Sequence, residues 1–145
     1  MRREEMSRSV MTIPSSLIRL DYNPAKDVLS VVWPDIQSYT MDKVRHTLKE
    51  VIDTVRYYDV KRLLIDSTTT VIGISREDYA TFAIDFGLQL KKTRLEKVAR
   101  LESSSNEREE QAQDIAKNAL IDATTIAFKN FSDREDALLW LETGY

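Results

Sequence analysis

The feature that most limits the fold is a short apolar run, Leu63-Leu64-Ile65, with no polar residue inside it. A strand that has one face in water alternates apolar and polar residues, so an unbroken run indicates a strand buried on both faces. Such strands belong to parallel sheets that are covered by helices. The run therefore predicts an α/β protein if amphipathic helices lie on either side of it in the chain.

Four stretches are predicted to be helices because apolar residues recur in them every three or four positions. The first follows Thr40, the predicted N-cap, and has Asp42 in its first turn. The other three begin with a capping signal, in which Ser or Asn precedes an acidic residue by three positions. The three pairs are Ser75 with Asp78, Asn106 with Glu109, and Ser132 with Glu135.

Short apolar segments between the helices are predicted to be strands, which gives the order β-β-α-β-α-β-α-β-α. Their residues are 17–22, 28–33, 63–65, 98–101 and 126–128. Residues 23–27 contain Pro, Asn and Asp, so we expect the first two strands to form an antiparallel hairpin, which Pro34 ends. The prediction is a mixed, mostly parallel five-stranded sheet with about four helices. It forms a single domain, residues 13–145, after a flexible N-terminal tail, residues 1–12.

Composition argues against several classes of function. The 21 basic and 24 acidic residues are well mixed, so no basic surface for nucleic acid is expected. The absence of cysteine excludes disulfides and thiolate chemistry, and it fits a reducing cytoplasm, where we expect the protein to reside. No apolar run approaches the ~20 residues that span a bilayer, so no transmembrane segment is expected.

Residues for enzyme chemistry are sparse. Glycine occurs only at positions 73, 87 and 144, too few for a phosphate-binding loop or a dinucleotide fingerprint. The single histidine, His46, lies off the apolar stripe of its helix and cannot by itself supply a typical zinc site or a supported triad. We therefore expect no cofactor, no metal and no enzymatic activity, although an enzyme that uses Asp66 is kept as a minor hypothesis.

The loop after the apolar run contains the candidate site. Asp66 ends the predicted strand, at the sheet edge where α/β proteins usually bind ligands, but it could equally close a turn by accepting loop N–H groups. Ser67 begins a run of four hydroxyl residues that either hold the loop or are exposed for modification. Ser75 is either a simple N-cap or a regulatory hydroxyl, because a phosphate there would lie at a helix N-terminus.

Three stretches carry a resemblance to a known family: the hairpin up to Trp33, the segment 61–66 with the cap at 75–78, and the segment 128–141. Together they resemble the STAS fold of bacterial anti-sigma-factor antagonists, and more closely the small uncharacterised SpoIIAA-like proteins of bacteria. The resemblance covers about residues 15 to 145, and the segment 128–141, which ends in Ala-Leu and Trp-Leu, is its most specific part.

The resemblance implies a non-enzymatic regulatory or protein-interaction module with a protein partner, controlled by serine phosphorylation. In the antagonists a helix begins with Asp-Ser-Ser-Gly, and a partner kinase phosphorylates one serine. The matching place here is Gly73-Ile74-Ser75-Arg76, which keeps a serine but lacks the preceding aspartate and the following glycine. Arg76 would either pair with a phosphate or discourage a kinase.

Two further hypotheses concern ligands and self-association. Some relatives of this type are grouped with lipid-exchange domains, which implies a module for a small apolar ligand or lipid with an apolar pocket under the second helix. Such a pocket would lie near Tyr79, Phe82 and Phe86, which we otherwise expect to be buried against the sheet. A homodimer is also expected, because the hairpin leaves a sheet edge and the aromatic residues Tyr57, Tyr58 and Trp140 could anchor contacts.

Overall fold

The computed structural model describes residues 10–13, 18–37, 41–103, 114 and 125–143. Within these ranges it contains three helices and eight strands. The helices are α2 (Met41–Tyr58), α3 (Arg76–Lys91) and α5 (Arg134–Thr143). The strands are β1 (Met11–Ile13), β2 (Leu20–Asn23), β3 (Val28–Val32), β4 (Ile36–Gln37), β5 (Arg62–Asp66), β6 (Ile72–Gly73), β7 (Lys97–Leu101) and β8 (Ala127–Phe131).

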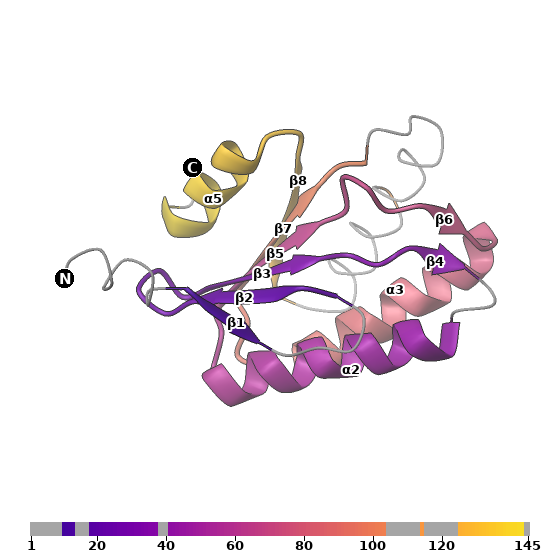
Figure 1. Cartoon of the computed structure of the whole chain (residues 1–145), viewed down its shortest axis with the longest axis horizontal. Coiled ribbons are helices and arrows are strands. Elements are labelled where there is room, and N and C mark those ends of the chain that lie inside the picture. Colours follow the sequence, from indigo (N-terminus) through magenta and orange to yellow (C-terminus); the bar gives the residue numbers. More distant parts are fainter. Residues whose placement is uncertain (1–9, 14–17, 38–40, 104–113, 115–124, 144–145) are drawn as a thin grey trace.

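The main sheet has the strand order β1-β2-β3-β5-β7-β8 (Figure 1). The pairs β1–β2 and β2–β3 are antiparallel, whereas β3–β5, β5–β7 and β7–β8 are parallel. The predicted hairpin is therefore confirmed, with Asn23 opposite Val28 across the turn. The general prediction of an α/β protein with a mixed, mostly parallel sheet is also confirmed.

The sheet has six strands where five are predicted, because β1 adds to the outer edge of β2. Met11 and Thr12, which we expect from the sequence to belong to the N-terminal tail, lie in this strand. Met11 packs against the core, and the Thr12 hydroxyl donates to Asp21 Oδ1 at 2.9 Å. A three-residue strand is too short to show a periodic pattern of apolar residues, so the sequence alone does not predict β1.

The two faces of the sheet are covered by different helices: α2 and α3 lie on one face and α5 on the other (Figure 1). Side chains alternate between these layers along each central strand. In β5, Leu63 and Ile65 belong to the core under α2 and α3, while Leu64 belongs to the core under α5. The unbroken apolar run is therefore buried on both faces, as its pattern predicts.

Three of the predicted helix starts either differ from the structure or lie outside the described residues. The N-cap of α5 is Asp133, whose Oδ2 accepts from Asp136 N at 3.1 Å, so the predicted cap Ser132 is wrong by one residue. Strand β8 runs on to Phe131, and Asp133 offers the same kind of acceptor one position later. The predicted third helix, with its cap Asn106, lies outside the described residues except for Asp114, which is helical, and Thr40 also lies outside them.

A small parallel ribbon extends the sheet beyond the carboxyl ends of β3 and β5. It pairs β4 with β6, with Ile36 opposite Ile72 and Gln37 opposite Gly73. A Cβ atom on Gly73 would clash with the end of the Gln37 side chain, so a larger residue at this position would require that side chain to move. Along the chain, β4 lies between β3 and α2, and β6 lies between β5 and α3.

Candidate functional site

Asp66, at the carboxyl end of β5, is held by its own loop. Its Oδ1 accepts from the backbone N of Thr68 at 3.0 Å and from the Thr68 hydroxyl at 2.6 Å. Its Oδ2 lies 3.9 Å from Arg134 Nη1 at the start of α5. These are the contacts of a carboxylate that closes a turn, and they leave Asp66 engaged from both sides.

The hydroxyl residues that follow Asp66 also hold the loop. Ser67 is only 1% exposed, and its Oγ donates to the carbonyl of Leu101 at 2.6 Å, which ties the end of β5 to the end of β7. The buried Thr70 hydroxyl donates to the carbonyl of Trp33 at 3.1 Å. Ser67 is therefore inaccessible to a modifying enzyme, and its role is structural.

Ser75 is the N-cap of α3, as predicted. Its Oγ accepts from Asp78 N at 3.1 Å, and its backbone is extended with φ −67° and ψ 161°. Both Ser75 and Arg76 are exposed. Among the described residues no hydrogen bond joins Ser75 to Asp66.

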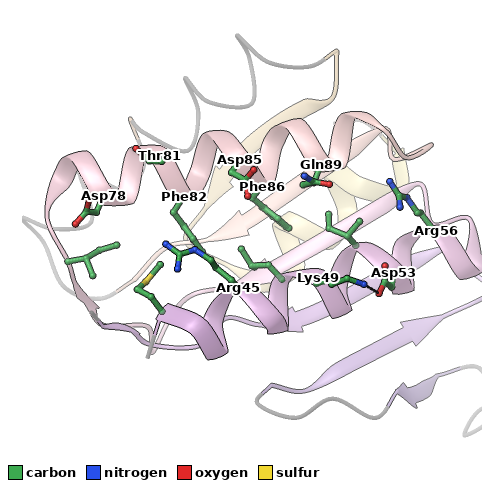
Figure 2. A pocket seen from close by; sticks show the side chains of 14 residues that line it. Arg45, Lys49, Asp53, Arg56, Asp78, Thr81, Phe82, Asp85, Phe86 and Gln89 are labelled. Atoms are coloured by element: carbon green, nitrogen blue, oxygen red, sulfur yellow. Dashed lines mark hydrogen bonds and ion pairs between the residues drawn. The ribbon is translucent and has the colours of Figure 1, made fainter. Parts of the chain in front are cut away.

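A groove of about 780 Å³ lies elsewhere, between α2 and α3 (Figure 2). We call it the α2–α3 groove. It is lined by Met41, Arg45, Leu48, Lys49, Ile52, Asp53 and Arg56 of α2, by Ile74, and by Asp78, Thr81, Phe82, Asp85, Phe86 and Gln89 of α3. No sequence motif pointed to this groove.

The floor of the groove is apolar. Leu48, Ile52, Phe82 and Phe86 keep between 5% and 8% of their surface exposed, whereas Val51 of the same helix layer keeps none. The floor residues are thus core residues that keep a small exposed surface in the groove. The prediction that Phe82 and Phe86 are buried is confirmed, and Phe86 also packs against Trp33 in the core.

The rims of the groove carry opposite net charges. Three basic residues, Arg45, Lys49 and Arg56, and one acidic residue, Asp53, line it from α2, whereas Asp78 and Asp85 line it from α3 (Figure 2). The ion pairs of the α2 rim run along the helix itself: Arg45 lies 3.7 Å from Asp42 and Lys49 lies 3.1 Å from Asp53. Among the described residues no ion pair crosses the groove, so the two rows of charge face solvent.

A second cavity lies directly beneath α3, where the sequence suggests a ligand pocket. It measures only about 40 Å³, although Tyr79, Phe82 and Phe86 line it as expected. Sites for small molecules usually enclose roughly 300–1,000 Å³. Arg100 borders this cavity at 4% exposure and donates from Nη1 to Asn130 Oδ1 at 3.1 Å. A cavity of this size has no room for a lipid or a metabolite.

A strongly raised pKa is found at a structural contact in the β2–β3 turn. The pKa of Tyr22 is raised to about 12, mainly by burial and also by its hydrogen bond to Asp27, whose Oδ1 accepts the phenol proton at 2.9 Å. Asp27 Oδ2 also accepts from Lys61 N at 3.2 Å. These residues lie at the β2–β3 turn, at the opposite end of β5 from Asp66, so the shift marks a turn and not a reaction site.

His46 is a largely exposed surface residue of α2, and its Nε2 lies 4.0 Å from Oε2 of Glu50. Within the described ranges no three His, Cys, Asp or Glu side chains gather where they could hold a metal ion. In the same ranges every helix is too short or too polar to serve as a membrane span.

Comparisons with protein-family models, with curated proteins and with solved structures found no significant match to the chain.

Proposed function

We propose that the chain is a non-enzymatic protein-interaction module of STAS-like type, and that the α2–α3 groove is its partner-binding surface. The observation that carries this proposal is the combination of an apolar floor with exposed charged rims that do not pair across the groove. Protein interfaces commonly combine an apolar centre with a polar, solvated rim. A groove of about 780 Å³ is also large enough to receive side chains of a partner.

The alternative sites offer less support for a function. Asp66 is engaged by Thr68 and Arg134, and Ser67 is buried on the carbonyl of Leu101. A reacting or ligand-binding group at this edge would first have to break contacts that hold the loop. This favours an interaction surface over an enzyme that uses Asp66.

Phosphorylation of Ser75 is part of the proposal, because this residue is exposed and lies between two groove residues, Ile74 and Asp78. A phosphate would add a charge of about −2 next to the acidic rim, where the N-terminus of α3 favours it and Asp78 opposes it. Such a charge would change how a partner meets this end of the groove. The alternative is that Ser75 acts only as a cap and carries no phosphate in the cell.

A small apolar ligand is the second candidate, and we propose the α2–α3 groove as its site in place of the pocket expected beneath α3. The groove, unlike the cavity of about 40 Å³ beneath α3, has the volume of a ligand site.

Homodimer formation also stays a prediction. Tyr57 is 81% exposed at the end of α2 and could contact a second copy. Sedimentation at high micromolar concentration would show a monomeric mass if this prediction is wrong.

Site-specific photo-crosslinking in native cells tests the proposed surface. A photoreactive amino acid replaces Gln89 at the groove rim, and in the matched control it replaces the exposed Glu135 of α5, on the opposite face of the sheet. We expect a defined protein adduct from position 89 and none from position 135. Equal adducts from both positions, or a lipid adduct at position 89, would contradict the proposal. Repeating the experiment with Ser75→Ala and Ser75→Glu tests the phosphate: identical adducts leave only the cap.

A further inference from the structure

The charged rims of the α2–α3 groove restrict the kind of partner more than its apolar floor does, because a partner must present complementary charges to them. We infer, building on the proposed function, that the groove receives an amphipathic helix of a partner protein. This helix carries acidic residues on the flank that faces α2 and basic residues on the flank that faces α3.

The length and periodicity of the groove match a helix. The residues that line it from α2 run from Met41 to Arg56 and recur at every turn of the helix. At 1.5 Å per residue this corresponds to about 22 Å, or roughly four helical turns. The floor residues Leu48 and Ile52 lie one turn apart, as do Phe82 and Phe86 opposite them. Apolar side chains at positions i, i+4, i+7 and i+11 of a bound helix would meet this spacing.

The opposite charges of the two rims distinguish between kinds of partner. Figure 2 shows Arg45 and Lys49 on the α2 side and Asp85 on the α3 side. An acyl chain bears its charge at one end only, so it cannot complement two rows of opposite sign along the whole groove. A helix with one acidic and one basic flank complements both rows, and like charges facing each other would penalise other partners.

A second copy of the chain fits less well. If two grooves faced each other, their rims would bring charged and polar side chains to the centre, and both apolar floors would stay unfilled. The exposed apolar residue of α5, Leu139, does not offer a suitable helix either, because the residues beside it are acidic on both flanks. These are Glu135, Asp136 and Glu142. Helix α5 therefore lacks the required basic flank.

Three synthetic peptides of about 18 residues, long enough for the groove, test this inference. All share one leucine stripe, and they differ in their flanks: one acidic and one basic, both acidic, or both basic. Calorimetric titration of the full chain should show that the mixed peptide binds roughly tenfold more tightly than either uniform peptide. Reversing the two flanks is no control, because a helix can enter the groove in either direction.

Charge reversal on one rim should then change the preferred peptide. The double variant Asp78→Lys/Asp85→Lys gives both rims a net positive charge, so the acidic peptide should become the tightest ligand. The matched variant Arg45→Glu/Lys49→Glu gives both rims a net negative charge, although Arg56 stays on the α2 rim, so the basic peptide should bind best. All four positions are exposed, and circular dichroism with urea unfolding checks that each variant is folded.

Equal binding of the three peptides, or the same ranking in both double variants, would overturn the inference. Tight binding of oleate that depends on the groove, without any discrimination among the peptides, would replace the helix by a lipid. These results are separate from those of the crosslinking experiment. If position 89 captures a protein but the peptides are not ranked by flank charge, the groove is an interaction surface and only the helical partner is wrong.

Discussion

The Asp66 loop and the α2–α3 groove are both rich in polar side chains, but they use them differently. In the loop, Asp66 and Ser67 bind the backbone of Thr68 and Leu101 at distances of 2.6 to 3.0 Å. In the groove, Arg45 and Lys49 of α2 pair, among the described residues, with neighbours on the same helix, and Asp85 faces solvent. Polar groups that the fold already engages stabilise it, and polar groups that it leaves in water are available to a partner.

The largest effect is expected where the groove and the core share a residue. Phe82→Ala should lower the free energy of unfolding by about 3–5 kcal/mol, because it removes a buried ring that stacks on Tyr79. Urea unfolding measures this loss. The exposed Ile84 of the same helix is the matched control, and Ile84→Ala should cost less than about 1 kcal/mol. A Phe82 variant as stable as the wild type would show that the floor belongs to an open site only.

The second-largest loss of stability is expected from substitutions in the Asp66 loop. Asp66→Ala removes the acceptor of the Thr68 amide and hydroxyl, so it should cost about 2 kcal/mol in thermal or urea unfolding. Asp66→Asn keeps an oxygen in the same place and should cost clearly less. If both variants were as stable as the wild type and had lost binding of a ligand or partner, the carboxylate would be functional and the contrast with the groove would fail.

Ser75 tests the boundary between the two regions. Ser75→Ala should cost about 1 kcal/mol through the lost cap on Asp78 N. Ser75→Asp should retain most of that stability, because aspartate is an equally good N-cap. A loss as small in Ser75→Ala as in Ser75→Asp, measured by urea unfolding, would mean that the cap contributes little.

The smallest change in stability is expected at the rims. Arg45→Glu and Asp85→Lys should each alter the free energy of unfolding by less than about 0.5 kcal/mol, because both residues are exposed. The same variants should nevertheless weaken binding of the mixed-flank peptide. A rim variant that unfolds the protein, or one that leaves peptide affinity unchanged, would remove the distinction between a structural loop and a binding groove.

The sequence by itself determined those features that depend on neighbouring residues. The unbroken run 63–65 predicted a strand buried on both faces, and Ser75 predicted a helix start, because capping and side-chain alternation act within a few residues. The turn at 23–27 likewise predicted the antiparallel hairpin. The STAS-like identity of the fold, drawn from the resemblance alone, stays a prediction.

The tertiary structure decided what depends on distant segments. Asp66 could have closed a turn or faced a ligand, and its contact with Arg134, 68 positions later by residue number, joins it to the far layer. Strand β1 and the α2–α3 groove likewise depend on neighbours that no local pattern specifies. The charged residues of α2 and α3 look in the sequence like ordinary solvated helix faces. Only the packing of both helices on the same face of the sheet turns those faces into two opposed rims above an apolar floor.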